Sequence, residues 1–204
     1  MYKKFSFLNS NFFGLILGMI ILATAIGCSG LGSGVSGAPA LTGVFIDSPV
    51  AGITYKTPTL GGLTDAAGTF NYKAGEVVTF SIGSVVLGSA VGKPIMTPLD
   101  IVEGAKDTAD QRVSNISAFL QTLDQDGNPA NGITISSKTA SFVDKYGKGI
   151  NFNTNIRAFS FNPGFRQVMT ELNEVDAFGD VPRAVVSAKV AKKNLDDAIS
   201  KLKK

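Results

Sequence analysis

Histidine and tryptophan are both absent from the 204-residue chain, and cysteine occurs once. Without histidine there can be no Ser-His-Asp or Cys-His catalytic arrangement, and no zinc, copper or haem site that depends on an imidazole ligand. A single cysteine excludes a disulfide within the chain. The chemistry that remains open is that of carboxylates or of a Ser-Lys pair, and the sequence carries no recognisable signature of either.

Charge is sparse and nearly balanced, with 19 Lys and Arg against 16 Asp and Glu and a net charge of +3. Lys3 and Lys4 stand before the first apolar run, so the chain beyond them is close to neutral. A nucleic-acid partner would require a concentrated basic surface, and we expect no such partner. The end of the chain is the most basic stretch, and there we expect a solvated helix face rather than a membrane-binding one. Its basic residues are Lys189, Lys192, Lys193, Lys201, Lys203 and Lys204.

The longest apolar run extends from Phe12 to Ile26 and contains no charged residue. It is shorter than the ~20 apolar residues that a membrane-spanning helix usually needs. It also follows two lysines, which is typical of a secretory signal peptide. The run ends in Ala25-Ile26-Gly27-Cys28. This segment resembles the lipobox of bacterial lipoproteins, in which small or aliphatic residues precede an obligatory cysteine.

The resemblance implies that the leader, residues 1–27, is removed and that the thiol of Cys28 carries a diacylglyceryl group. A further acyl chain on the new amino group would complete the anchor, because one chain alone holds a protein on a membrane only marginally. Ser29, a residue other than Asp after the cysteine, implies transport to the outer membrane. We therefore expect an outer-membrane lipoprotein, facing the periplasm or the outside. The alternatives are an uncleaved signal anchor and a plain signal peptide with an incidental cysteine.

The stretch that follows the cysteine, SGLGSGVSGAPA at residues 29–40, is rich in Gly and Ser. This composition is typical of a flexible linker. It includes a Gly-x-Gly-x-x-Gly spacing, but no predicted strand precedes it and no predicted helix follows it, as a dinucleotide site would require. We expect residues 28–40 to be the acylated cysteine and a tether.

Residues 41–100 contain short β-type runs separated by turn signals. In one of these runs apolar residues alternate, which places Val78, Phe80 and Ile82 on one face. Gly83-Ser84 then fits the two-residue turn of a hairpin. We expect strands at residues 44–46, 50–55, 69–72, 76–82 and 85–87, and a loop at 57–62. This spacing predicts a small antiparallel β-sandwich or barrel.

After about Pro98 the apolar residues follow the helical period. Asp110 is the expected N-cap of the first helix, and Pro182 suits the first turn of the last one. Strands followed by helices predict an α+β fold, in which residues 101–204 form a helical subdomain packed on the β part. We expect the helices at residues 110–123, 138–146, 163–175 and from 182 to the C-terminus.

Aromatic residues are concentrated in the helical half. At this density they are more often core than the lining of an apolar ligand groove, so we expect them to hold the helices on the sheet. They are Phe142, Tyr146, Phe152, Phe159, Phe161 and Phe165.

Several stretches spread over most of the chain form a recognisable series. They are VAGITY at 50–55, TDAAGTFNY at 64–72, GEVVTFSIG at 75–83, TPLD at 97–100 and LQTLDQDGNPANGI at 120–133. The series resembles a module of proteobacterial surface lipoproteins and large exported proteins, and its first half is also similar to prealbumin-like or Cna-B-like β-sandwiches. The resemblance implies a location and an architecture more than an activity.

Asp124, Asp126 and Asn128 occupy alternate positions in one loop, and oxygen ligands at this spacing can converge on calcium. The full EF-hand pattern fails, because Pro129 stands where that loop needs glycine and Ile135 where it needs a bidentate Glu. Two carboxylates and one amide also fall short of the roughly six to eight oxygens that calcium takes. We therefore favour a chain-reversing turn that requires no cofactor, with a calcium site as the alternative.

Asp47 and Asp65 both flank predicted strands at turns. Such residues usually cap a turn by bonding their own backbone, and we expect the same here. A contribution to a second cation site is the alternative.

Three functions fit these features. We favour a lipid-anchored cell-envelope protein that acts as a non-enzymatic structural, adhesion or interaction module, with the membrane as one partner through Cys28 and an envelope protein or surface ligand as another. The alternative is a ligand- or carbohydrate-binding lipoprotein, although sugar sites usually rely on aromatic side chains and tryptophan is absent. The second alternative is a hydrolase that uses two carboxylates across a cleft.

Overall fold

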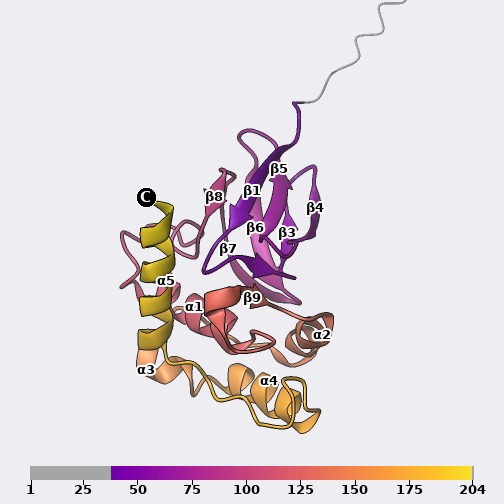
Figure 1. Ribbon diagram of the computed structural model, residues 1–204, viewed down its shortest axis with the longest axis vertical. Coiled ribbons are helices and arrows are strands. Elements are labelled where there is room, and N and C mark those ends of the chain that lie inside the picture. Colours follow the sequence, from indigo (N-terminus) through magenta and orange to yellow (C-terminus); the bar gives the residue numbers. More distant parts are fainter. Residues whose placement is uncertain (1–37, 204) are drawn as a thin grey trace, which may run out of the picture. The chain divides into compact units, whose positions relative to one another are not determined.

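The computed structural model describes residues 38–203 (Figure 1). The leader, Cys28 and all but the end of the tether lie outside the described residues, so the lipobox interpretation stays a prediction. The described residues form one compact unit. Its strands and helices contribute to a single hydrophobic core, as a domain that folds alone requires. No helix within residues 38–203 is long and apolar enough to cross a membrane.

The strands of the described part form three separate sheets, none of which closes into a barrel. One has the order β5-β1-β8, a second the order β4-β3-β6-β7, and the third is the pair β2-β9. Pairing is antiparallel except for β1 with β8 and β2 with β9. The strands are β1 (Leu41–Phe45), β2 (Val50–Ala51), β3 (Thr54–Lys56), β4 (Gly61–Leu63), β5 (Thr69–Tyr72), β6 (Val77–Ile82), β7 (Val85–Val91), β8 (Ile95–Met96) and β9 (Ile133–Thr134).

Two of the sheets pack face to face through the alternating apolar residues of their strands. Val78, Phe80 and Ile82 are all buried, so the predicted face of β6 is confirmed. The ring of Phe80 lies 4.5 Å from that of Phe45 on β1 and 5.1 Å from that of Phe70 on β5, measured between centroids. These contacts join the two sheets as in a β-sandwich. The predicted α+β class, with the sandwich rather than the barrel, is confirmed.

The prediction of one continuous strand at 50–55 is wrong, because the structure has two short strands there, separated at Gly52. This glycine has φ +80°, and a Cβ there would collide with the carbonyl oxygen of Ile135. The chain therefore turns between β2, which pairs with β9, and β3, which joins the larger sheet. The predicted loop at 57–62 is shorter than expected, since Gly61 and Gly62 belong to β4.

The helices begin close to the predicted positions, apart from the last. The side chain of Asp110 accepts a hydrogen bond from the backbone of Arg112, which confirms the predicted N-cap. Ten of the twelve residues of α1 are buried, so its polar side chains must find partners inside the protein. The helices are α1 (Gln111–Thr122), α2 (Ser137–Tyr146), α3 (Ile156–Phe159), α4 (Pro163–Glu174) and α5 (Ala188–Leu202), with a short 3₁₀ turn at Pro129–Asn131.

Of the aromatic residues of the helical half, Phe159 and Phe165 are buried in the core, and Phe142, Tyr146 and Phe152 are partly buried against it. The rings of Phe119, Phe152, Phe159 and Phe165 lie 5.1–5.6 Å apart in successive pairs. They therefore connect α1, α3 and α4 with one another, within the same core that holds the buried strand residues. Phe161 is an exception, because it is 69% exposed.

The last helix starts six residues later than its proline signal predicted. The backbone N–H of Arg183 donates to Oδ1 of Asn173, and that of Val186 donates to Oγ1 of Thr122. These hydrogen bonds hold the segment 181–187 against α4 and α1 without helical structure. Ser187 then caps α5 through Val190. The segment that the sequence placed in a helix consequently becomes a wall of the site described next.

Candidate functional site

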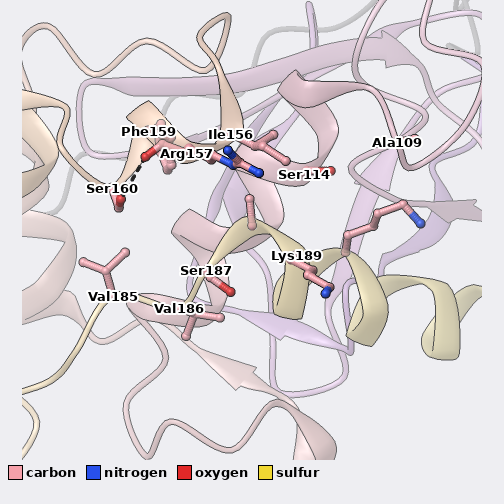
Figure 2. Close-up of a pocket in the computed structure, with 12 residues that line it drawn as sticks. Ala109, Ser114, Ile156, Arg157, Phe159, Ser160, Val185, Val186, Ser187 and Lys189 are labelled. Atoms are coloured by element: carbon pink, nitrogen blue, oxygen red, sulfur yellow. Dashed lines mark hydrogen bonds between the residues drawn. The ribbon is translucent and has the colours of Figure 1, made fainter.

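A groove of about 550 Å³ lies between α3 and the start of α5 (Figure 2). This volume falls within the range of small-molecule sites in proteins, about 300–1,000 Å³. One wall comes from α3 and Ser160, and the other from the segment before α5 and the first turn of that helix. The lining residues are Ala109, Ser114, Ile156, Arg157, Phe159, Ser160, Val185, Val186, Ser187, Ala188, Lys189 and Lys192.

Both walls of the groove are fixed to the buried helix α1. On one side the side chain of Asn155 caps the short helix α3, and Phe159 is buried in the aromatic cluster that includes Phe119 of α1. On the other side the backbone N–H of Val186 is bonded to Thr122 of α1. The groove is thus built on the core, and its shape does not depend on a free loop.

The surface of the groove is apolar and its charged side chains are all basic. Ile156 is 40% exposed, and Val185 and Val186 are half-buried. Arg157 and Lys189 form no ion pair within residues 38–203, whereas Lys192 is paired with Asp196 at 2.6 Å. No carboxylate lines the groove. An apolar surface with two unpaired cations can accommodate a molecule that is both apolar and anionic.

The three residues of the calcium hypothesis lie together in the loop after α1, where their oxygens accept hydrogen bonds from the chain. Asp124 accepts from the backbone of Thr134 at 2.8 Å. Asp126 accepts from the backbone of Asn128 and from the side chain of Asn131, at 2.9 and 2.8 Å. Asn128 in turn accepts from the backbone of Ala130. This is the hydrogen bonding of a chain-reversing turn.

A guanidinium group lies against the same loop. Arg183 donates to the carbonyl oxygen of Gln125, and a Cβ at Gly127 would collide with its guanidinium. Hydrogen bonds from Asn131 and Asn128 lower the pKa of Asp126, and the charge of Arg183 acts in the same direction. Burial raises the pKa of Asp124, whose Oδ2 has no hydrogen-bond partner. No group of three metal-ligating His, Cys, Asp or Glu residues occurs in the described range.

We expect calcium to leave the stability of this loop unchanged, because its carboxylates already bind backbone N–H groups and face Arg183. Fragment 36–204 should therefore unfold at the same temperature in excess EDTA and in millimolar calcium, as followed by circular dichroism. Asp126→Ala, which removes one carboxylate of the loop, is measured under the same two conditions as a control. A rise in melting temperature with calcium in the wild type but not in Asp126→Ala would establish the alternative, a calcium site.

Asp47 and Asp65 were both predicted to cap turns, but only one of them does so. Asp65 caps its turn as expected, accepting from the backbone of Ala67 and Thr69. Asp47 does not, because its side chain is turned into the core and is 1% exposed. Its Oδ1 accepts from Nε2 of Gln121 at 3.1 Å, while Oδ2 has no hydrogen-bond partner. Burial raises the pKa of Asp47 to about 8, against the opposing effect of Gln121 and Ser117.

The hydrogen bonds around Asp47 link three parts of the fold. Gln121 of α1 also donates to the carbonyl oxygen of Ala191 and accepts from Nδ2 of Asn194, both in α5. Asp47 itself lies between β1 and β2. At neutral pH its carboxyl group is therefore a protonated member of a polar network that joins the β part to two helices.

Comparison with known proteins gives no match: no protein-family model fits the sequence, and neither a curated protein nor a solved structure is similar to it. The similarity to surface-lipoprotein modules consequently stays a prediction.

Sequence reasoning missed the groove, although two local signals point to its walls. Asn155 before Ile156 and Ser187 before Ala188 are both good N-cap residues, and each of them caps a helix in the structure. Reading Ser187 rather than Pro182 as the start of the last helix would have left the preceding segment free to form a wall.

Proposed function

We propose that this chain is a lipid-anchored protein of the bacterial cell envelope, attached to the outer membrane through Cys28, and that its folded part is a non-enzymatic interaction module. The lipobox-like segment supports the anchor. The first strand begins at Leu41, 13 positions after Cys28. A linker of this length reaches at most about 45 Å when fully extended, so the folded part would remain close to the membrane surface.

The observation that carries the proposal is the position of the groove relative to the start of the fold. In Figure 1, β1 begins at one end of the described part, while α3 and the first turn of α5 lie at the opposite end. A module tethered through Leu41 keeps that groove away from its point of attachment. A partner or ligand can therefore reach the groove while the protein stays anchored.

The anchor is tested by mass spectrometry of the mature amino terminus after expression in a Gram-negative host. We expect an N-terminal Cys28 with a diacylglyceryl thioether and a further acyl chain. We also expect Cys28→Ser to lose incorporation of labelled palmitate and its lipid-dependent membrane attachment. An unmodified cysteine, or a leader still present, would contradict the proposal. Proteolysis of intact cells distinguishes a surface-facing protein from a periplasmic one.

A second candidate function, a ligand-binding lipoprotein, is favoured by the groove itself. The groove combines a suitable volume, apolar walls and converging polar groups, which together are typical of small-molecule sites. Its lining supplies no carboxylate, and it therefore gives no support to the alternative of a carboxylate-based hydrolase.

A further inference from the structure

We propose that the groove between α3 and α5 binds a single-chain anionic amphiphile, an acyl chain that ends in a carboxylate. The acyl chain would lie on the apolar walls and the carboxylate would pair with Arg157 and Lys189. The inference rests on the second candidate function, ligand binding, and names the chemical class of the ligand.

The apolar part of the ligand is inferred from what the walls offer. Ile156, Val185 and Val186 present aliphatic side chains, and the largely buried Phe159 also lines the groove. The backbone N–H of Val186 already donates to Thr122, so it is not free to bind a ligand. Covering these side chains with an acyl chain removes apolar surface from water, which is favourable.

The anionic end is inferred from the charges at the groove. Figure 2 shows Arg157 extending from α3 and Lys189 lying on the first turn of α5, so that the two cations come from opposite walls. Neither of them is paired with a carboxylate of the described chain. A guanidinium binds a carboxylate through two parallel hydrogen bonds, and an ammonium adds a point charge. An anionic head group therefore complements this site and a cationic one does not.

Lys192 is less suited to this role, because Asp196 already neutralises it. Nζ of Lys192 lies 2.6 Å from that carboxylate, which also accepts a hydrogen bond from Thr108. The net charge offered to a ligand is thus that of Arg157 and Lys189. The volume of about 550 Å³ is in the lower half of the range for small-molecule sites, and this favours one acyl chain over two.

The test uses fragment 36–204 and sodium laurate, kept below the concentration at which laurate aggregates, with binding measured by isothermal titration calorimetry. Dodecyltrimethylammonium has a chain of the same length and the opposite charge, and hexanoate has the same head group and a shorter chain. We expect laurate to bind with one molecule per chain. Both comparison compounds should bind at least tenfold more weakly.

The site is located by a charge-neutralising double variant, Arg157→Gln with Lys189→Gln. Both positions are exposed, so we expect an unchanged melting temperature and at least a tenfold loss of laurate affinity. The matched control is Arg166→Gln with Lys203→Gln, which removes the same charges outside the groove and should bind laurate as the wild type does. Equal loss in the two double variants, or no loss in either, would overturn the proposal.

The remaining outcomes separate the proposal from the functions on which it rests. If laurate and dodecyltrimethylammonium bind equally well at the groove, the inference of an anionic head group is wrong. The proposed ligand-binding function is then still supported. If neither binds, the proposed ligand class is overturned, and the ligand-binding function is then judged by whether other small molecules bind at the groove. The lipid anchor is judged independently, by the mass of the mature amino terminus.

Discussion

Raising the pH from about 5 to about 9 is expected to destabilise fragment 36–204 by several kcal/mol, and Asp47→Asn is expected to remove most of this loss. The cause is the buried carboxyl group of Asp47, whose pKa is raised from 3.8 to about 8 by burial. Between about pH 4 and pH 8 the folded state holds a proton that the unfolded state has released. Unfolding therefore becomes more favourable as the pH rises.

The direction and the size of the effect follow from the two pKa values. The stability that Asp47 contributes is complete below pH 4 and is lost as the pH rises toward 8, where the folded carboxyl group ionises as well. Each pH unit between these values is worth about 1.4 kcal/mol, so the full shift sets an upper bound of about 6 kcal/mol. We expect a smaller measured loss, because relaxation and water penetration reduce the cost of a buried charge.

Other carboxylates do not obscure this signal. Asp65, Glu76, Asp110 and Asp126 have lowered pKa values, chiefly through hydrogen bonds that favour their charged forms. Burial acts to raise the pKa of Asp196, but hydrogen bonds from Lys192 and Thr108 together outweigh it, so this pKa is also lowered. Their contributions are present above the unfolded pKa and are lost only at acid pH. The pKa of Asp124 is raised by burial, which acts in the same direction as Asp47. Between pH 5 and 9 the five carboxylates with lowered pKa values therefore contribute a constant amount, and Asp124 adds to the loss expected of Asp47.

Asp47→Asn keeps the interactions of the neutral carboxyl group and removes its titration. The amide oxygen can accept from Gln121. The amide nitrogen can donate to Oγ of Ser117, which lies near the Asp47 carboxyl group but forms no hydrogen bond of normal geometry in the structure. We expect stability equal to that of the wild type at pH 5 and greater at pH 9. Urea unfolding followed by circular dichroism measures both, since the chain has no tryptophan. Asp65→Asn is the control, and parallel pH curves for the wild type and Asp47→Asn would refute the prediction.

The contrast between Asp47 and Asp65 shows how far local sequence determines a side chain's environment. Both residues lie next to strands, in sequences that favour a turn. Asp65 accepts hydrogen bonds from the backbone of its own turn, as the local pattern predicts. Asp47 is instead bonded to Gln121, 74 positions further along the chain. A partner at that distance is set by the packing of α1 on the sheets, which no local pattern encodes.

The same distinction separates the elements that were predicted from those that were missed. The strand β6 and the helix α1 have clear hydrophobic periods of their own, and both were predicted within a few residues. The segment 181–187 contains a proline suited to a helix start, but Asn173 and Thr122 bond its backbone from other helices. Tertiary hydrogen bonds therefore override the local signal, and the groove, which depends on this segment, was not predictable from periodicity.

The second large effect is expected from Phe159→Ala, which should lower the free energy of unfolding by about 3–5 kcal/mol. Phe159 is 1% exposed, and its ring lies 5.1 Å from that of Phe165 and 5.6 Å from that of Phe152. Truncation removes these contacts and leaves a cavity at the point where α3 meets α1 and α4. The surrounding rings come from three different segments and cannot all move inward to fill it.

Phe161→Ala is the matched control, because the same residue type is removed two positions away. Phe161 is 69% exposed, so its loss should change the free energy of unfolding by no more than about 0.5 kcal/mol. Urea unfolding at pH 6 measures both variants under conditions in which Asp47 stays protonated in the folded state. Similar losses for the two variants would mean that α3 is not fixed by the aromatic cluster. The groove would then lack the rigid wall on which its selectivity for a ligand depends.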